Sequence, residues 1–153
     1  MADYFLDSSA IVKRYINEMG SAFVDELIGP DRENNIFIAE ITRAEVASAF
    51  ARREKGKTLT TGDAATARDA FAVDVADVYA IIDITPELIT NAADLATKHA
   101  VRGYDAVQLA AALTANLNLT AGGHSVLTFV SADGDLNLAA VAERLTVENP
   151  NDH

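Results

Sequence analysis

Four acidic residues occupy positions from which their carboxylates could meet and carry out hydrolytic chemistry. Asp7 and Asp133 each follow a short apolar run that is typical of a buried strand. Glu45 and Asp105 fall in the first turn or so of two predicted helices. Because the functional crevice of an open parallel sheet lies beyond the carboxyl ends of its strands, all four carboxylates can point toward the same edge.

A convergent set of four carboxylates would repel itself strongly unless a cation sat among them. Hard divalent cations such as Mg²⁺ and Mn²⁺ prefer oxygen ligands, polarise a phosphate and lower the pKa of a bound water. Taken singly, each acid also has an ordinary structural interpretation. Asp7, Asp105 and Asp133 could be helix caps, and Glu45 could be a solvated helix residue.

Apolar runs alternate with segments of helical periodicity along the chain, which indicates an α/β fold. We expect a parallel central sheet of four to five strands with helices on both faces. A glycine-rich loop is expected at 118–125. Strands are expected near residues 4–6, 36–39, 79–84, 126–130 and 145–147, and helices near 10–15, 42–53, 58–76, 86–99, 105–117 and 135–143.

Helical periodicity also suggests which side chains of the two middle helices are buried. On the helix near 42–53 the predicted buried face consists of small and aromatic side chains, and the same is true of the next helix. The expected inward residues are Ala44, Ala47, Phe50 and Ala51 in the first helix and Ala67, Ala70 and Phe71 in the second.

Length and composition limit the classes of protein to be considered. The 153 residues suit one domain, predicted at 1–148, with a polar tail at 149–153. The chain has no cysteine, no apolar run of roughly 18 residues and no basic stretch before an apolar one at its start, so we expect a cytoplasmic protein without membrane contact. The net charge of −11 disfavours passive RNA binding but permits a divalent-cation site.

Four segments, in this order and with these neighbours, resemble the PIN-domain nucleases of the VapC kind over nearly the whole chain. The block Arg-Gly-Tyr-Asp-Ala at 102–106 is the most specific of them, whereas an acid after an apolar strand is a weak signal alone. The segments are Tyr4-Phe5-Leu6-Asp7-Ser8-Ser9-Ala10, residues 42–49 (TRAEVASA), residues 102–113 (RGYDAVQLAAAL) and residues 127–136 (LTFVSADGDL).

The resemblance implies a PIN-like fold and an endoribonuclease that hydrolyses RNA phosphodiester bonds with Mg²⁺ or Mn²⁺. It implies that the metal-binding and catalytic residues are Asp7, Glu45, Asp105 and Asp133. It further assigns supporting roles to Ser8, Ser131 and Asp135. One departure is Gln108, where relatives often carry histidine, and we expect this side chain to contact the acids little.

The resemblance also implies partners, namely an RNA substrate, a small antitoxin protein that wraps the toxin, and a second copy of the chain in a homodimer. Basic residues close in sequence to the acidic motifs are the candidates for contacts with RNA phosphates, and these are Lys13, Arg14, Arg43 and Arg102. The basic run at 52–57 is either a surface facing RNA or a solvated helix end that complements the helix dipole.

Other acidic doubly wound domains fit the sequence less well. A phosphate-switch receiver needs adjacent acids after its first strand, and a haloacid-dehalogenase-type phosphatase needs two aspartates that flank one residue there. Asp7-Ser8-Ser9 supplies neither pattern. The alternative that stays open is a catalytically weak PIN-fold binding module that acts through a protein partner.

Overall fold

The fold is built on a five-stranded sheet in which every neighbouring pair of strands is parallel, with the order β3-β2-β1-β4-β5. The computed structural model describes residues 1–153. The central strand β1 pairs Phe5 with Phe37 on one side and with Phe129 on the other. The strands are β1 Asp3–Leu6, β2 Asn35–Ala39, β3 Tyr79–Ile82, β4 Thr128–Val130 and β5 Thr146–Glu148.

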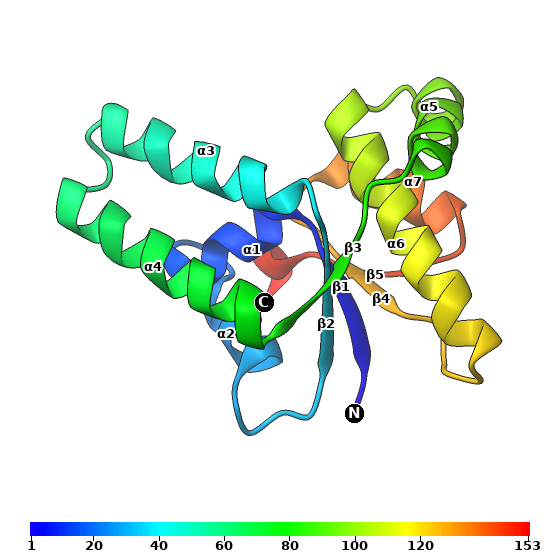
Figure 1. Cartoon of the computed structure of the whole chain (residues 1–153), viewed down its shortest axis with the longest axis horizontal. Helices are drawn as coiled ribbons and strands as arrows, with labels where there is room; N and C mark the ends of the chain where they lie inside the picture. Colours follow the sequence, from blue (N-terminus) through cyan, green and yellow to red (C-terminus); the bar gives the residue numbers. More distant parts are fainter.

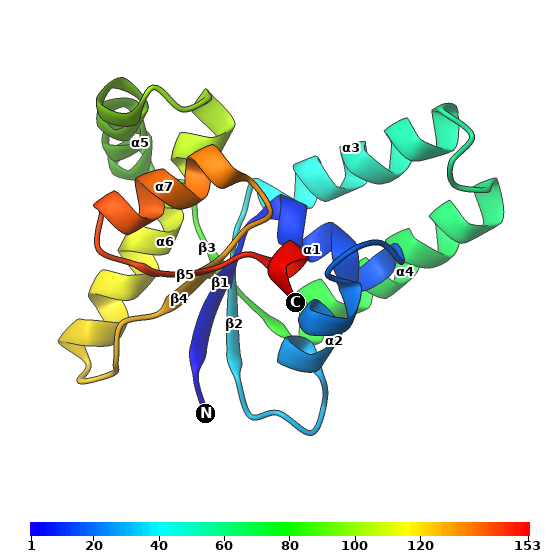
Figure 2. The same ribbon diagram turned by 180° about the vertical axis from the view of Figure 1, so that it is seen from behind.

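Helices cover both faces of this sheet, as Figures 1 and 2 show from opposite sides. Successive strand residues point to opposite faces, so Leu6 packs with α1–α4 and Phe5 packs with α5–α7 in two separate hydrophobic clusters. The predicted α/β architecture is therefore confirmed. The helices are α1 Ser8–Tyr15, α2 Ser21–Ile28, α3 Thr42–Lys55, α4 Thr61–Asp77, α5 Pro86–His99, α6 Gly103–Ala121 and α7 Gly134–Ala142.

Helices α3 and α4 form a hairpin that projects away from the sheet (Figure 1). Phe50 of α3 is buried as predicted, but the small residues Ala44, Ala47 and Ala51 are exposed. The buried stripe of α3 instead runs through Val46 and Phe50, which pack in the α1–α4 cluster. The sequence prediction was wrong here because a projecting helix is covered only where α1 and α4 touch it.

The buried face of α4 was predicted more closely. Ala67 and Phe71 are buried, with Ala64 one turn before them, whereas Ala70 is exposed. The helix begins at the Thr60 cap, whose side chain accepts a hydrogen bond from the backbone amide of Asp63 at 3.0 Å.

Two segments carry more helix than their sequences indicated. Helix α2 was not predicted, and α6 continues to Ala121 through the first half of the loop expected at 118–125. The Asn116 side chain in α6 accepts a hydrogen bond at 3.0 Å from the backbone amide of Leu127, just before β4. This tertiary contact ties the end of α6 to the next strand.

The C-terminal residues are docked on the domain. A short 3₁₀ helix, Pro150–Asp152 (η1), buries Pro150 against the N-terminal end of α2. Gly20 permits this approach, since a Cβ at that position would lie 2.7 Å from the Pro150 carbonyl oxygen and the backbone φ there is +84°. The ring of His153 stacks on Phe23 at 3.9 Å between centroids.

No helix of the structure has both the length and the apolar character that crossing a membrane requires.

Candidate active site

Asp7 lies where β1 ends and caps the N-terminus of α1. Its Oδ1 accepts hydrogen bonds from the Ala10 amide at 3.0 Å and the Ser9 hydroxyl at 2.7 Å, and its Oδ2 accepts one from the Ser131 hydroxyl at 2.7 Å. The side chain is buried, and this burial raises the pKa of Asp7 to about 6 against the lowering effect of those hydrogen bonds. The charge of Glu45 raises it further.

Ser9 and Ser131 connect the ends of β1 and β4. The Ser131 hydroxyl donates to Asp7 and accepts from the Asp133 amide at 3.1 Å, while the Ser9 hydroxyl accepts from the Ala132 amide at 2.9 Å. The carboxylate is thereby held by both loops that leave the sheet at this edge.

The supporting role expected for Ser8 falls to its neighbour. Ser8 lines the cavity described below but makes no side-chain hydrogen bond in the structure, whereas Ser9 bonds Asp7. The two serines are equivalent in sequence. Successive helical residues point about 100° apart, so the direction in which α1 starts decides which hydroxyl reaches Asp7.

Glu45 is fixed by a contact that the sequence analysis missed. Gln108, buried in α6, donates from Nε2 to Glu45 Oε1 at 2.7 Å and to Thr42 Oγ1 at 2.9 Å. The expectation that Gln108 contacts the acids little is therefore wrong. Because α6 packs against β2, which leads into α3, Gln108 and Glu45 meet although they are 63 residues apart.

Asp105 and Asp133 complete the acidic set. Asp105 lies in the first turn of α6, and partial burial raises its pKa, helped by the charges of Asp133 and Glu45 and opposed by Arg102. Asp133 caps α7, accepting at Oδ1 from the Leu136 amide at 3.0 Å. Asp133 therefore both caps a helix and belongs to the acidic set, so its two alternative interpretations from sequence are compatible.

All four predicted acids line one cavity of about 690 Å³ at the carboxyl edge of the sheet. No three acidic or histidine side chains in the structure are arranged so that they could hold a metal ion as they stand. The cavity is lined by Asp7, Ser8, Ser9, Val12, Lys13, Glu18, Glu45, Ala49, Arg52, Arg53, Gly56, Thr58, Arg102, Asp105, Ala132 and Asp133.

The basic residues predicted to touch RNA fall in different places. Arg102 lines the cavity beside Asp105. Lys13 also lines it, but its buried ammonium group donates to Glu18 and to the Met19 carbonyl oxygen at 3.2 and 2.7 Å. The structure does not bring Arg14 or Arg43 to the cavity. Arg14 pairs with Asp25 and Asp74, and Arg43 pairs with Glu40.

The end of α3 contributes two arginines of the basic run at 52–57, which the sequence left open as either a surface facing RNA or a solvated helix end. Arg52 and Arg53 both line the cavity, and Arg53 donates to Glu18 at 2.6 Å. Burial opposes ionisation of Glu18, but the hydrogen bonds from Arg53 and Lys13 prevail and lower its pKa. Glu18 thus pairs with two of the four basic side chains that line the cavity, while Arg52 and Arg102 have no acidic partner within salt-bridge distance.

Residues 4–144 match the family described as PIN domain. This chain belongs to the PIN domain family. The match includes the four cavity acids, and it agrees with the resemblance inferred from the sequence motifs. No curated protein matches the chain significantly.

Three solved structures share the fold of this PIN domain at low sequence identity. One is VapBC2 from Rickettsia felis bound to a DNA fragment from its promoter, with a TM-score of 0.64, 17% identity and coverage of 96% of this chain and 98% of that one. PAE2754 from Pyrobaculum aerophilum has a TM-score of 0.64 and 18% identity, with coverage of 99% of this chain and 91% of that one. VapC20 from Mycobacterium tuberculosis is described as a Sarcin-Ricin loop cleaving toxin. It has a TM-score of 0.62 and 16% identity, with coverage of 89% of this chain and 94% of that one.

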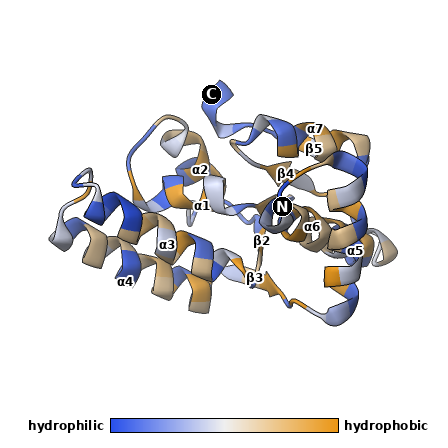
Figure 3. Ribbon diagram, turned by 90° about the horizontal axis from the view of Figure 1, so that it is seen from above, coloured by the Kyte–Doolittle hydropathy of each residue, from blue (hydrophilic) through white to orange (hydrophobic).

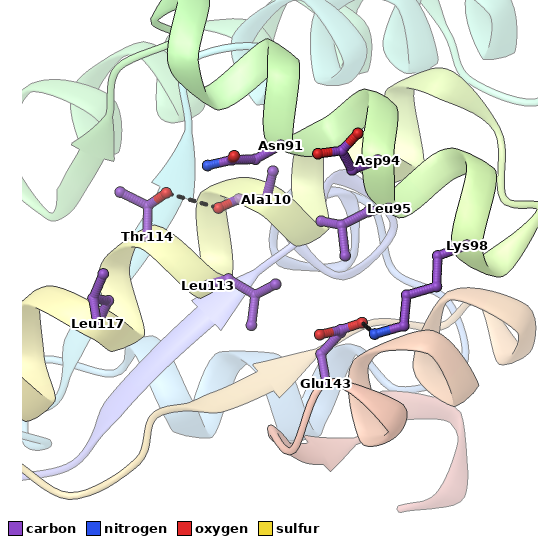
Figure 4. Close-up of a pocket in the computed structure, with 9 residues that line it drawn as sticks. All are labelled: Asn91, Asp94, Leu95, Lys98, Ala110, Leu113, Thr114, Leu117 and Glu143. Carbon is purple, nitrogen blue, oxygen red and sulfur yellow. Dashed lines mark hydrogen bonds and ion pairs between the residues drawn. The ribbon is translucent and has the colours of Figure 1, made fainter.

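One predicted site residue, Asp135, and one groove on the surface of the PIN domain lie away from the acid cavity. Asp135, expected to assist the site, is exposed on α7 and lines another hollow with His99 and Leu138. A groove of about 360 Å³ lies between α5 and α6, and Lys98 pairs with Glu143 beside it at 2.6 Å. Figure 4 shows the residues that line this groove. Neither place brings two of the four predicted acids together, so the cavity lined by Asp7 is the candidate active site.

Proposed function

We propose that this PIN domain is a divalent-cation-dependent endoribonuclease. The observation that carries the proposal is the convergence on one cavity of four carboxylates, from the β1–α1 junction, α3, α6 and the β4–α7 loop. A cluster made only of carboxylates suits phosphodiester hydrolysis, in which the reacting groups are anionic and need a cation between them and the protein.

The donor chemistry of this cavity fits Mg²⁺ or Mn²⁺. The four acids offer only hard oxygen ligands, and no cysteine exists anywhere in the chain. Burial raises the pKa values of Asp7 and Asp105, and repulsion from Glu45, and for Asp105 also from Asp133, raises them further; a bound cation would offset that repulsion. Since no three of the acids form a ready set of ligands, binding would require some of these side chains to rotate.

When bound, the cation would polarise the scissile phosphate and lower the pKa of a coordinated water. Asp7, Glu45, Asp105 and Asp133 are the residues that would hold it. Asp7 needs no further ordering, because Ser9, Ser131 and the Ala10 amide already fix its carboxylate. Gln108 holds one oxygen of Glu45 and leaves the other oxygen, Oε2, without a protein hydrogen bond. Arg102 supplies positive charge beside Asp105 for a substrate phosphate.

We propose further that the chain is the toxin of a toxin–antitoxin pair and acts in the cytoplasm as a homodimer. The support is the fold shared with VapBC2 and with the cleaving toxin VapC20 over about nine-tenths or more of each chain. The net charge of −11 favours a partner that presents a basic segment. We expect an Arg or Lys of that partner to lie near the acid cluster, where it would offset the repulsion among the carboxylates.

The direct test is RNA cleavage by the purified full chain. We expect cleavage in millimolar-range Mg²⁺ or Mn²⁺ and its loss in EDTA. Mapping new RNA 5′ ends after expression in cells would identify the target. Cleavage that persists unchanged in EDTA would exclude the cation mechanism, and failure to cleave any RNA with either metal would favour the alternative of a binding module.

A further inference from the structure

One face of α3 forms a continuous wall of the acid cavity. Glu45, Ala49, Arg52, Arg53 and Gly56 all line it, at a spacing of four, three, one and three residues. This spacing places them along one stripe of a helix, since residues seven apart are separated by nearly two full turns. The cavity therefore runs from the acids at the sheet edge toward the free end of the α3–α4 hairpin.

Basic side chains gather toward that far end. Figure 3 shows strongly hydrophilic residues at the end of α3 away from the sheet, and the last turn of α3 contains Arg52, Arg53 and Lys55. The cavity is lined by four of the twelve Lys and Arg residues of a chain whose net charge is −11. A polyanion approaching this surface is repelled at most places, so the basic side chains of the cavity are where its backbone can bind.

The pairing of these basic residues singles out Arg52. Lys13 and Arg53 are committed to Glu18, whose ionised carboxylate takes a hydrogen bond from each. Arg52 is exposed and has no acidic partner. Its guanidinium is therefore free to make the paired N–H contacts that suit a phosphate.

We propose that Arg52 binds a backbone phosphate of the RNA on one side of the cleaved bond. The proposal rests on the proposed ribonuclease function. It adds to the acid cluster, where the scissile phosphate would bind, a second position that binds a neighbouring phosphate. Arg52 lies seven residues after Glu45, which is about 10 Å along the helix axis and spans roughly three stacked nucleotides of one strand. The Arg53–Glu18–Lys13 chain shapes the wall of the cavity beside this position.

The test compares Arg52→Gln with Lys55→Gln. Lys55 is the matched control because it is exposed and basic in the same last turn of α3 but does not line the cavity. Both variants lose the same charge near the helix C-terminus, so any effect of the dipole is shared. Binding of fluorescent single-stranded RNA by the full chain is measured by anisotropy in EDTA, at a series of salt concentrations.

We expect Arg52→Gln to weaken binding and to reduce the slope of log Kd against log salt by about 0.7, the value for one phosphate contact on a single strand. Lys55→Gln should keep the wild-type slope. RNAs shortened from the 5′ or the 3′ end supply a second readout. Wild-type affinity should fall when about three nucleotides are removed on one side, and Arg52→Gln should not respond to that removal.

Equal slopes for the two variants, whether both reduced or both unchanged, would overturn the proposal, as would a wild-type chain that does not bind RNA. The ribonuclease proposal fails separately. If wild type cleaves RNA in a metal-dependent way while Arg52→Gln matches Lys55→Gln in KM, only the Arg52 position is wrong. If Arg52→Gln shows the reduced salt slope but neither wild type nor any variant cleaves RNA, the binding position stands without the nuclease.

Discussion

Asp7 and Glu45 at one end of the cavity are held in a different way from Arg52 at the other end. At the acidic end Asp7 is 4% exposed and takes three hydrogen bonds, and Glu45 is held by a glutamine that is 1% exposed. At the basic end Arg52 is exposed, comes from a projecting hairpin and lacks an acidic partner. Asp7 and Glu45 are fixed by hydrogen bonds from other elements of the fold, whereas Arg52 depends on one helix.

This difference suggests two separate roles: the buried carboxylates position the reacting groups, and the exposed arginine attracts the phosphate backbone of the RNA. A buried, hydrogen-bonded carboxylate keeps one orientation, so its loss should remove chemistry outright. An exposed arginine attracts a phosphate from many orientations, so its loss should weaken binding in a salt-dependent way and leave the chemical step intact. Substitutions at the acidic end should therefore have larger effects than those at the basic end.

The largest effect is expected for the acids themselves. Asp7→Asn and Asp105→Asn should each lower cleavage by at least about 10²-fold, because they remove a group that would bind the cation directly. Asp135→Asn is the matched control, since Asp135 is an exposed acid outside the cavity and should be dispensable. Rates are measured with a single RNA substrate at saturating Mg²⁺. Full activity of either cavity variant would remove that residue from the site.

A second effect concerns stability and pH. The pKa of Asp7 is about 6 in the folded chain against an ordinary value of 3.8, so the folded state binds the proton more tightly. In EDTA its contribution to the free energy of unfolding should be greatest below about pH 4 and decline by on the order of 3 kcal/mol as pH rises to about 6.5. Glu18 and Glu143, whose pKa values are lowered, contribute in the opposite sense, so the decline is measured as the difference between thermal melts of wild type and Asp7→Asn across this range.

Asp7→Asn provides the comparison for that pH dependence. Its amide oxygen can still accept from the Ala10 amide, so the helix cap is retained while the buried charge is lost. We expect this variant to melt above wild type at pH 7.5 in EDTA, and Mg²⁺ to stabilise wild type more than the variant. If the melting temperatures of the two proteins respond identically to pH and to Mg²⁺, Asp7 neither destabilises the fold by its buried charge nor contacts the cation.

A third effect tests the contact between Gln108 and Glu45. Gln108→Leu should lower activity by roughly 10- to 100-fold, the usual cost of losing a group that orients a metal ligand. Titration calorimetry with Mg²⁺ should show weaker binding, which a purely structural role would not produce. Thr42→Val is the control, because it removes the other hydrogen-bond partner of Gln108 while leaving the bond to Glu45. Equal Mg²⁺ affinity in Gln108→Leu and wild type would contradict a positioning role.

The smallest effect separates two adjacent serines. Ser9→Ala removes hydroxyl contacts to Asp7 and to the Ala132 amide and should cost about 1–2 kcal/mol of stability. Ser8→Ala should change stability by less than about 0.5 kcal/mol, because Ser8 makes no side-chain hydrogen bond. Chemical denaturation of both variants measures the difference. Equal losses would indicate that the two hydroxyls share the task.

The sequence by itself determined the parallel sheet, the positions of most helices and the presence of four acids at its carboxyl edge. These features depend on local signals, namely apolar runs, helical periodicity and residues that follow a strand, such as Asp7. The sequence also supplied the family, because the motif at 102–106 is specific.

Only the tertiary structure decided which side chains meet. Gln108 holds Glu45 across 63 residues, and Ser9 rather than Ser8 holds Asp7, because helix packing and helix phase set those contacts. Arg14 and Arg43 lie close in sequence to the acids but face acidic partners elsewhere. Arg52 lines the cavity because two turns of α3 carry it there from Glu45. Sequence proximity does not encode such directions, since they depend on how each helix is rotated against the sheet.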